Sequence, residues 1–241
     1  MNDLFISYAH IDDLPISEDQ KGWISEFHRV LQNRLAQLMG EKPKIWRDQK
    51  LSGSDIFDNE IVDQFKNTKL MVSVLSPRYI KSEWCNKEIK EFYRNAELSS
   101  GVALAGKSRV LKVVKTPYDP QDVHPELKQV FGSVLGFNFY DFDNDSGKVV
   151  EYNEAFGKEA RQNYFTRIYD LAYEICEILK NSDGKRNDSS ETTLPKQGAK
   201  TVYLATTTAD RNEDRENIAR DLRERGHLIL PDRQLPFDEE T

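Results

Sequence analysis

A tryptophan and a glutamate four residues apart are the side chains best placed for chemistry in this sequence. In a helix, this spacing puts Trp84 and Glu88 on the same face. The Glu88 carboxylate then borders an apolar stripe formed by Cys85, Ile89 and Phe92. A carboxylate beside an indole near a cleft is a candidate catalytic acid, whereas a glutamate on an ordinary surface helix is a solvated charge.

Short apolar runs predict the strands that would position this helix. Residues 4–8, 45–47, 70–75 and 109–114 form four runs, and Phe137, Phe139 and Phe142 mark a fifth. Apolar residues at helical spacing predict helices between them, over residues 56–65 and 83–98 and in a last segment that ends near residue 181. Because strands and helices alternate, we predict an α/β, flavodoxin-like domain. Its open parallel five-stranded sheet has the order 2-1-3-4-5, with helices on both faces.

The first helix carries start and stop signals of its own. Ser17 followed by Gln20 has the spacing of a capping box and predicts the start. Gly40 predicts the end, because glycine adopts the left-handed conformation that closes many helices.

The predicted sheet order also indicates where a ligand would bind. Open parallel sheets bind ligands beyond the carboxyl ends of the strands, where the winding direction reverses, here between the first and third strands. The residues that the sequence delivers to this point are Tyr8, Ala9 and His10 after the first strand, Arg47 and Asp48 after the second, and Ser76 and Pro77 after the third.

The composition changes abruptly after the last of these helices. Residues 1–180 are predicted to form the α/β domain, and residues 181–199 are polar, with glycine and proline, as in a linker. Residues 200–241 have the strand, helix and strand pattern that opens a second α/β domain, which we expect to be truncated because this segment alone is too short to bury a core.

The overall charge and the cysteine content exclude several classes of function. The 241 residues carry a formal net charge of −7 with no basic stripe, so we expect no nucleic-acid contact. The two cysteines, Cys85 and Cys176, lie far apart in apolar patterns, which indicates neither disulfides nor a zinc site and favours the cytoplasm. No apolar run is long enough to span a membrane, and no histidine cluster suggests a metal.

Four short motifs give the sequence a specific resemblance. It resembles the bacterial Toll/interleukin-receptor (TIR) domains of the NAD+-cleaving branch over approximately residues 1–180. The motifs that carry the resemblance are residues 5–8 (FISY), residues 46–48 (WRD) with Leu51, Ser52 and Gly53 behind them, residues 74–77 (VLSP), and residues 82–85 (SEWC) with Glu88.

The resemblance implies an activity and a mode of regulation. Enzymatic TIR domains cleave the bond between nicotinamide and ribose in NAD+ with a glutamate placed as Glu88 is, and their bacterial members commonly act as immune, anti-phage effectors. The loop over residues 48–58 matches the family's BB loop, which packs against a neighbouring subunit and helps to complete the active site. The resemblance therefore implies TIR-to-TIR self-association, with NAD+ as substrate and with neither a separate cofactor nor a metal.

Several residues are expected to contact the substrate. Arg47 and Lys50 are candidates for the pyrophosphate, and Tyr8 or Trp46 could stack on a ring. Each has an ordinary alternative, since Arg47 and Lys50 could be solvated and Asp48 could cap the loop. The full predicted binding set is Ser7, Tyr8, Ala9, Trp46, Arg47, Asp48, Lys50 and Trp84.

Two other classes of function remain open. A non-enzymatic TIR scaffold would signal through TIR-to-TIR contacts alone, and replacing Glu88 with alanine would then leave its function intact. A flavodoxin-like nucleotide-binding or receiver module fits poorly, because no glycine-rich phosphate loop follows the first strand.

Overall fold

A computed structural model describes most of the chain. The described residues are 2–47, 64–99, 101–104, 107–131, 134, 136–143, 145–182, 200–205, 207, 211–225 and 227–230. The predicted loop over residues 48–58 lies outside them, as does most of the helix predicted over residues 56–65, of which Gln64 and Phe65 are described and helical.

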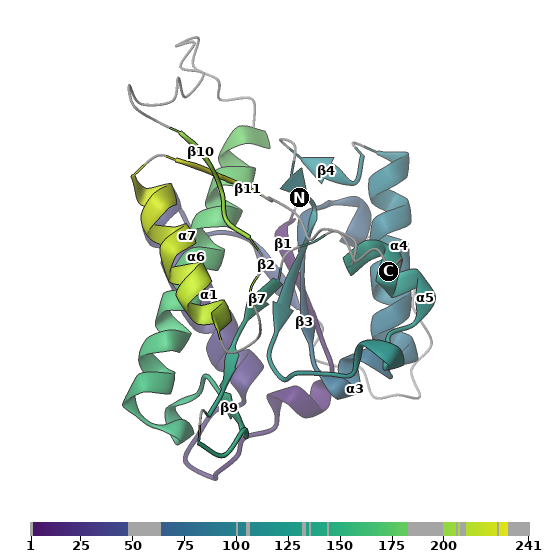
Figure 1. Ribbon diagram of the computed structural model, residues 1–241. Helices are drawn as coiled ribbons and strands as arrows, with labels where there is room; N and C mark the ends of the chain where they lie inside the picture. Colours follow the sequence, from purple (N-terminus) through teal and green to yellow (C-terminus); the bar gives the residue numbers. More distant parts are fainter. Residues whose placement is uncertain are drawn as a thin grey trace, which may run out of the picture.

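A five-stranded parallel sheet forms the centre of the domain (Figure 1). Its strands are β1 (Asn2–Tyr8), β2 (Ile45–Arg47), β3 (Thr68–Leu75), β6 (Val110–Val114) and β7 (Gly136–Asn138), in the order β2-β1-β3-β6-β7. Because β4 (Ala103–Leu104) and β5 (Lys107–Ser108) pair only with each other, β6 and β7 are the fourth and fifth strands of this sheet. The predicted α/β fold and its 2-1-3-4-5 order are confirmed.

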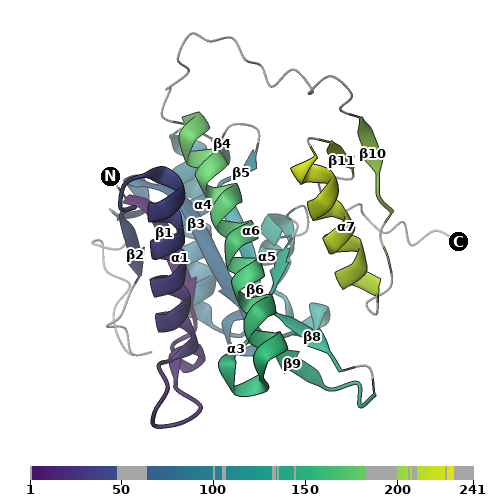
Figure 2. The ribbon, with the colours of Figure 1, turned by 90° about the vertical axis from the view of Figure 1, so that its left-hand side faces the viewer.

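Helices cover both faces of the sheet (Figures 1 and 2). On one face, α1 (Trp23–Met39) packs against α6 (Lys158–Ser182). The other face carries α3 (Pro77–Ile80), α4 (Glu83–Leu98) and α5 (Pro125–Phe131). Side chains alternate along a strand, so Leu4, Ile6 and Tyr8 of β1 enter the core under α1 and α6, whereas Phe5 enters the core under α4 and α5.

The first helix begins later than its capping-box pattern predicts. Its N-cap residue is Gly22, and the helix starts at Trp23, so the prediction from Ser17 and Gln20 is wrong. The Asp13 carboxylate supplies the cap instead, because its Oδ1 accepts a hydrogen bond from the Ser25 N–H at 2.7 Å. Glycine suits position 22, since a Cβ there would lie 1.8 Å from the Asp13 carbonyl oxygen. The predicted end is confirmed: Gly40 is the C-cap residue, with φ of 78°.

The carboxyl end of the sheet carries short elements that the sequence pattern does not predict. Two 3-10 turns follow strands, η1 (His10–Asp13) after β1 and η2 (Pro120–Asp122) after β6. The fifth strand ends at Asn138, and Phe142 belongs instead to a hairpin of β8 (Tyr140–Phe142) and β9 (Val149–Glu151), followed by η3 (Glu154–Phe156). This hairpin brings an acidic side chain, Glu151, back to the end of the sheet.

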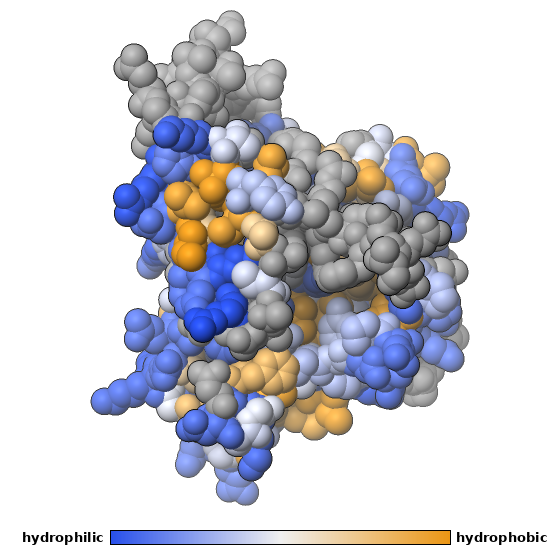
Figure 3. Space-filling model, viewed as in Figure 1, coloured by the Kyte–Doolittle hydropathy of each residue, from blue (hydrophilic) through white to orange (hydrophobic). Residues whose placement is uncertain are grey.

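The C-terminal part of the chain forms a small β-α-β unit. Strands β10 (Thr201–Tyr203) and β11 (Leu228–Leu230) are parallel and are joined through α7 (Asn212–Glu224). Apolar surface gathers over this unit in Figure 3, and Ile218 of α7 is 50% exposed. The division into a domain over residues 1–180, a linker over 181–199 and the start of a second domain over 200–241 stays a prediction. None of the helices in the described part of the chain combines the length and apolar character needed to cross a bilayer.

Candidate active site

Glu88 lies in the interior of the domain, at the centre of a small hydrogen-bonded cluster. Helix α4 starts at a serine cap, where Ser82 Oγ accepts from the Cys85 N–H at 3.3 Å, and this start sets which residues face the sheet. One turn apart, Trp84 Nε1 donates to Glu88 Oε1 at 3.2 Å. Glu88 is 3% exposed, so the alternative of a solvated surface charge is wrong.

The second carboxylate oxygen of Glu88 is bonded from strand β1. Ser7 Oγ donates to Glu88 Oε2 at 2.5 Å, and the same hydroxyl lies 3.0 Å from the Tyr79 hydroxyl of α3. Burial raises the pKa of Tyr79 well above its usual value, with the Cys85 thiol and the Glu88 carboxylate as further causes, so this phenol stays neutral. The carboxylate is therefore held between an indole and a serine hydroxyl that itself contacts a buried phenol.

Burying the Glu88 carboxylate costs desolvation free energy, which its hydrogen bonds must offset. A buried charge requires partners, and each hydrogen bond to a charged group contributes about 1.5–3 kcal/mol. Both Glu88 oxygens have such partners from two different elements, α4 and β1. The cluster therefore fixes the position and orientation of one carboxylate, which is what a catalytic carboxylate needs.

Cys85 lies beside this cluster as a buried thiol. Its Sγ lies 3.6 Å from the Tyr8 carbonyl oxygen. Burial raises the pKa of the thiol, and the nearby Glu88 carboxylate raises it further. Cys85 therefore behaves as an apolar residue and not as a nucleophile.

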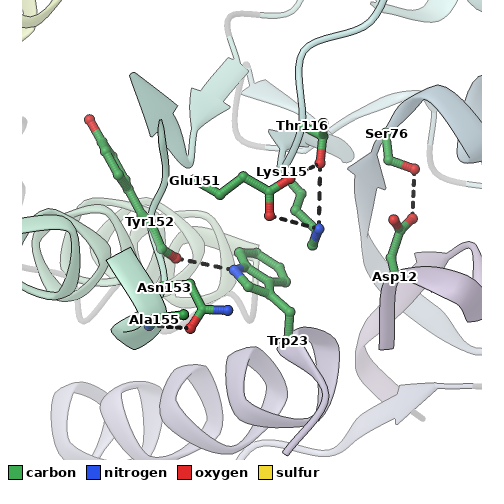
Figure 4. Close-up of polar contacts among 9 residues, drawn as sticks. All are labelled: Asp12, Trp23, Ser76, Lys115, Thr116, Glu151, Tyr152, Asn153 and Ala155. Carbon is green, nitrogen blue, oxygen red and sulfur yellow. Dashed lines mark hydrogen bonds and ion pairs between the residues drawn. The ribbon is translucent and has the colours of Figure 1, made fainter. Parts of the chain in front are cut away.

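A second group of polar side chains surrounds the carboxyl ends of β1, β3 and β6 (Figure 4). Ser76 Oγ, at the end of β3, donates to Asp12 Oδ2 of η1 at 2.6 Å. Lys115, which follows β6, lies 3.0 Å from Glu151 Oε2, and the Thr116 hydroxyl bonds the other oxygen of the same carboxylate. Burial raises the pKa of Asp12, the bond from Ser76 and the charge of Lys115 lower it, and Glu151 raises it.

The Trp23 ring lies at the edge of this second group, on the side of α1. The Lys115 ammonium lies 5.9 Å from the centre of the Trp23 ring, and Trp23 Nε1 donates to the Tyr152 carbonyl at 3.2 Å. The sequence pattern placed Ser76 at the predicted switch point without giving it a role. It did not single out Asp12, Lys115 or Glu151.

The side chains of Arg47 and Tyr8 leave the sheet on the face opposite Glu88. In the register of the sheet Arg47 pairs with Ile6, so its side chain shares the face of Tyr8, whereas Ser7 points to the face of Glu88. The Arg47 guanidinium binds Asp13 Oδ2 at 3.2 Å and donates to Ser25 Oγ at 3.1 Å. Arg47 is thus bonded to η1 and α1, on the face of the sheet opposite α4.

Arg47 instead forms the wall of a separate cavity of about 390 Å³, lined by Tyr8, His10, Asp13, Leu14, Ser25 and Arg47. The Tyr8 and His10 rings are stacked, with their centroids 5.5 Å apart. The cavity adjoins the ends of β1 and β2 on the side of α1.

The other predicted binding residues have diverse surroundings. Trp46 stacks on Phe5 with ring centroids 4.7 Å apart and thus packs against the core. Ala9 is buried in the same core, whereas Asp48 and Lys50 lie outside the described residues. Among the residues described, no group of three or more His, Cys, Asp or Glu side chains could hold a metal ion.

A comparison with protein-family models identifies the family of this domain. The family model described as "TIR domain" matches residues 4–148. No curated protein is significantly similar to the chain. Solved structures that are similar include the TIR domains in the structure of the activated Roq1 resistosome directly recognizing the pathogen effector XopQ. That chain is 15% identical, the match covers 92% of this chain and 99% of that one, and the TM-score is 0.36.

Proposed function

Because the chain belongs to the TIR domain family, we propose that it cleaves the bond between nicotinamide and ribose in NAD+, with Glu88 as its catalytic carboxylate. The observation that carries the proposal is the burial of this carboxylate between Ser7 and Trp84. Ser7 is part of β1, and the first turn of α4 follows β3 closely, so the cluster lies near the strands that flank the switch point.

The chemistry suits a single fixed carboxylate. As nicotinamide departs, positive charge develops on the ribose, and a nearby carboxylate stabilises that charge. The leaving group is already cationic in NAD+ and departs as a neutral molecule, so it needs no general acid, unlike the leaving groups of ordinary glycosidases. In this reaction Glu88 serves as the electrostatic partner of the ribose.

The bond from Ser7 supports our proposal for the contact between Glu88 and the sugar. Glu88 Oε2 accepts a hydrogen bond from a serine hydroxyl at 2.5 Å, and a ribose hydroxyl is the same kind of donor. We infer that the ribose hydroxyls bond to this carboxylate in place of Ser7 or beside it. Trp84 holds the other oxygen and keeps the carboxylate oriented during the exchange.

Other predicted binding residues would contact the rest of the substrate. Tyr8 lines the cavity of about 390 Å³ and could stack on a ring there, and Trp46 and Ala9 remain proposed contacts on the Glu88 side. Arg47 is engaged by Asp13, which favours a structural role over a pyrophosphate contact. Asp48 and Lys50 remain proposed contacts from the loop over residues 48–58.

We propose further that the protein is a cytoplasmic immune, anti-phage effector that oligomerisation activates. This part follows from the family resemblance, because the loop over residues 48–58 corresponds to the loop that meets a neighbouring subunit in TIR assemblies. Self-association would then complete the active site.

Incubation of the purified protein with NAD+ under assembling conditions, with products resolved by chromatography, tests the proposal. We expect NAD+ to be consumed and free nicotinamide to appear, with ADP-ribose as the second product if water is the nucleophile. Unchanged NAD+ at every protein concentration would favour the alternative, a non-enzymatic scaffold that acts through TIR-to-TIR contacts.

A further inference from the structure

Asp12 lies at the switch point of the sheet and has no part in the chemistry assigned to Glu88. Resting on the proposed NAD+ cleavage, we propose that the Asp12 carboxylate is the general base that activates the attacking water. Glu88 would then stabilise the positive charge that develops on the ribose, and Asp12 would accept a proton from the attacking water.

The position of Asp12 is fixed by the two strands that flank the switch point. It lies in η1 directly after β1, where its N–H donates to the Ala9 carbonyl at 2.8 Å. From the neighbouring strand, Ser76 Oγ donates to Asp12 Oδ2 at 2.6 Å (Figure 4). The bond thus bridges the ends of β1 and β3, between which a ligand of an open parallel sheet binds.

Contacts through α3 connect this carboxylate with the Glu88 cluster. Ser76 Oγ accepts from the Tyr79 N–H at 3.1 Å, and the Tyr79 hydroxyl lies 3.0 Å from Ser7 Oγ, which donates to Glu88. Both carboxylate charges raise the pKa of the Cys85 thiol, after burial as the main cause. Tyr79 thus connects Asp12 and Glu88 through Ser76 and Ser7, without a direct bond between the two carboxylates.

Asp12 has the properties that a base requires and that Glu88 lacks. Both oxygens of Glu88 are engaged by donors, whereas Asp12 Oδ1 has no hydrogen-bond partner among the described residues, and the residue is only half-buried. Burial raises the pKa of Asp12, which increases its affinity for a proton taken from water. The groups that face it are Ser76, Lys115, Glu151 and the Cys85 thiol.

The proposed step balances as follows. The bond between C1′ of the ribose and the nicotinamide nitrogen breaks, and its electron pair leaves with neutral nicotinamide. The water oxygen forms a bond to C1′, and one water proton passes to Asp12 Oδ1. The products are nicotinamide and ADP-ribose, and Asp12 then releases its proton to solvent.

Nicotinamide exchange separates this role from bond cleavage. In exchange, labelled nicotinamide enters NAD+ by attack on C1′, so it requires the cleavage step but no activated water. We expect Asp12→Asn to lower hydrolysis by about 10²-fold or more while exchange changes by less than about threefold. Asparagine can still accept the bond from Ser76, so the fold should survive, as circular dichroism would verify. Asp19→Asn, in the exposed loop after η1, is the matched control and should leave both rates unchanged.

Two results would overturn the inference. Equal losses of hydrolysis and exchange would make Asp12 a structural tie between β1 and β3, and hydrolysis unchanged by Asp12→Asn would remove it from the reaction. If the unaltered protein neither hydrolyses NAD+ nor exchanges nicotinamide, the proposed function fails and this inference fails with it. Suppose instead that the unaltered protein both hydrolyses NAD+ and exchanges nicotinamide, and that Asp12→Asn behaves as Asp19→Asn does. That result would refute only the inference.

Discussion

Replacing Ser7 with alanine tests whether the Glu88 carboxylate is held as the structure shows. Ser7 is 1% exposed, and its hydroxyl donates to Glu88 at 2.5 Å and contacts the Tyr79 hydroxyl at 3.0 Å. The substitution removes a bond to a charged group, worth about 1.5–3 kcal/mol, and one partner of a buried phenol, which adds about 1 kcal/mol. We therefore expect the free energy of unfolding to fall by about 2.5–4 kcal/mol.

Urea unfolding followed by circular dichroism measures this loss as a shift of the transition midpoint at constant slope. The matched control is Ser99→Ala, at the exposed end of α4, which should change the free energy of unfolding by less than about 0.5 kcal/mol. A double-mutant cycle of Ser7→Ala with Glu88→Gln should give a coupling of at least about 1 kcal/mol. A Ser7→Ala loss no larger than that of the control, with no coupling to Glu88, would refute the proposed cluster.

Four further predictions test other parts of the site. Trp84→Phe keeps a ring but removes the indole donor to Glu88, so it should lower NAD+ turnover by about tenfold, and an unchanged rate would show that Trp84 does not orient the carboxylate. Because burial raises the pKa of Asp12 above 3.8, the folded state disfavours its ionised form, and stability falls as pH rises from 3.8 through the raised value. Asp12→Asn should therefore be at least as stable as the unaltered protein at pH 7, and the two proteins should have equal stability below pH 3.8. Urea unfolding at the two pH values measures this, and a less stable variant at pH 7 would contradict it. Cys85, whose thiol pKa is raised by burial, should react with a maleimide only as fast as the protein unfolds, and rapid labelling of the native protein would contradict its burial. Finally, turnover per protomer should rise with protein concentration, and full turnover in a dilute sample shown to be monomeric by light scattering would exclude activation by assembly.

The sheet and its order follow from local patterns that the sequence displays. Continuous apolar runs such as residues 70–75 indicate strands covered on both faces, and alternation with helices predicts a parallel sheet. The contact between Trp84 and Glu88 is also local, because four residues make one turn of α4. These features require no knowledge of distant parts of the chain.

The features that sequence reasoning missed depend on contacts between distant residues. Asp13 caps α1 from outside the helix, so the local Ser17 pattern misplaced the start. The face of Arg47 is set by its pairing with Ile6, which a three-residue strand does not reveal. The bond from Ser7 to Glu88 joins residues 81 positions apart.

The same limit applies to the second polar group. Glu151 reaches the end of the sheet only because the β8–β9 hairpin folds back. The sequence of that segment has no strong apolar pattern that would predict a strand. Asp12 and Ser76 lie at the end of the sheet where the switch point is predicted. Which side chains meet there is decided by tertiary packing.

The central claim, that Glu88 is the catalytic carboxylate for NAD+ cleavage, is tested most directly by the rate of nicotinamide release. The comparison is between the unaltered protein, Glu88→Gln, and Glu97→Gln, which replaces an exposed glutamate on the same helix. We predict that Glu88→Gln lowers the rate by about 10²-fold or more and that Glu97→Gln leaves it unchanged. A folded Glu88→Gln protein that releases nicotinamide within about threefold of the unaltered rate would contradict the claim.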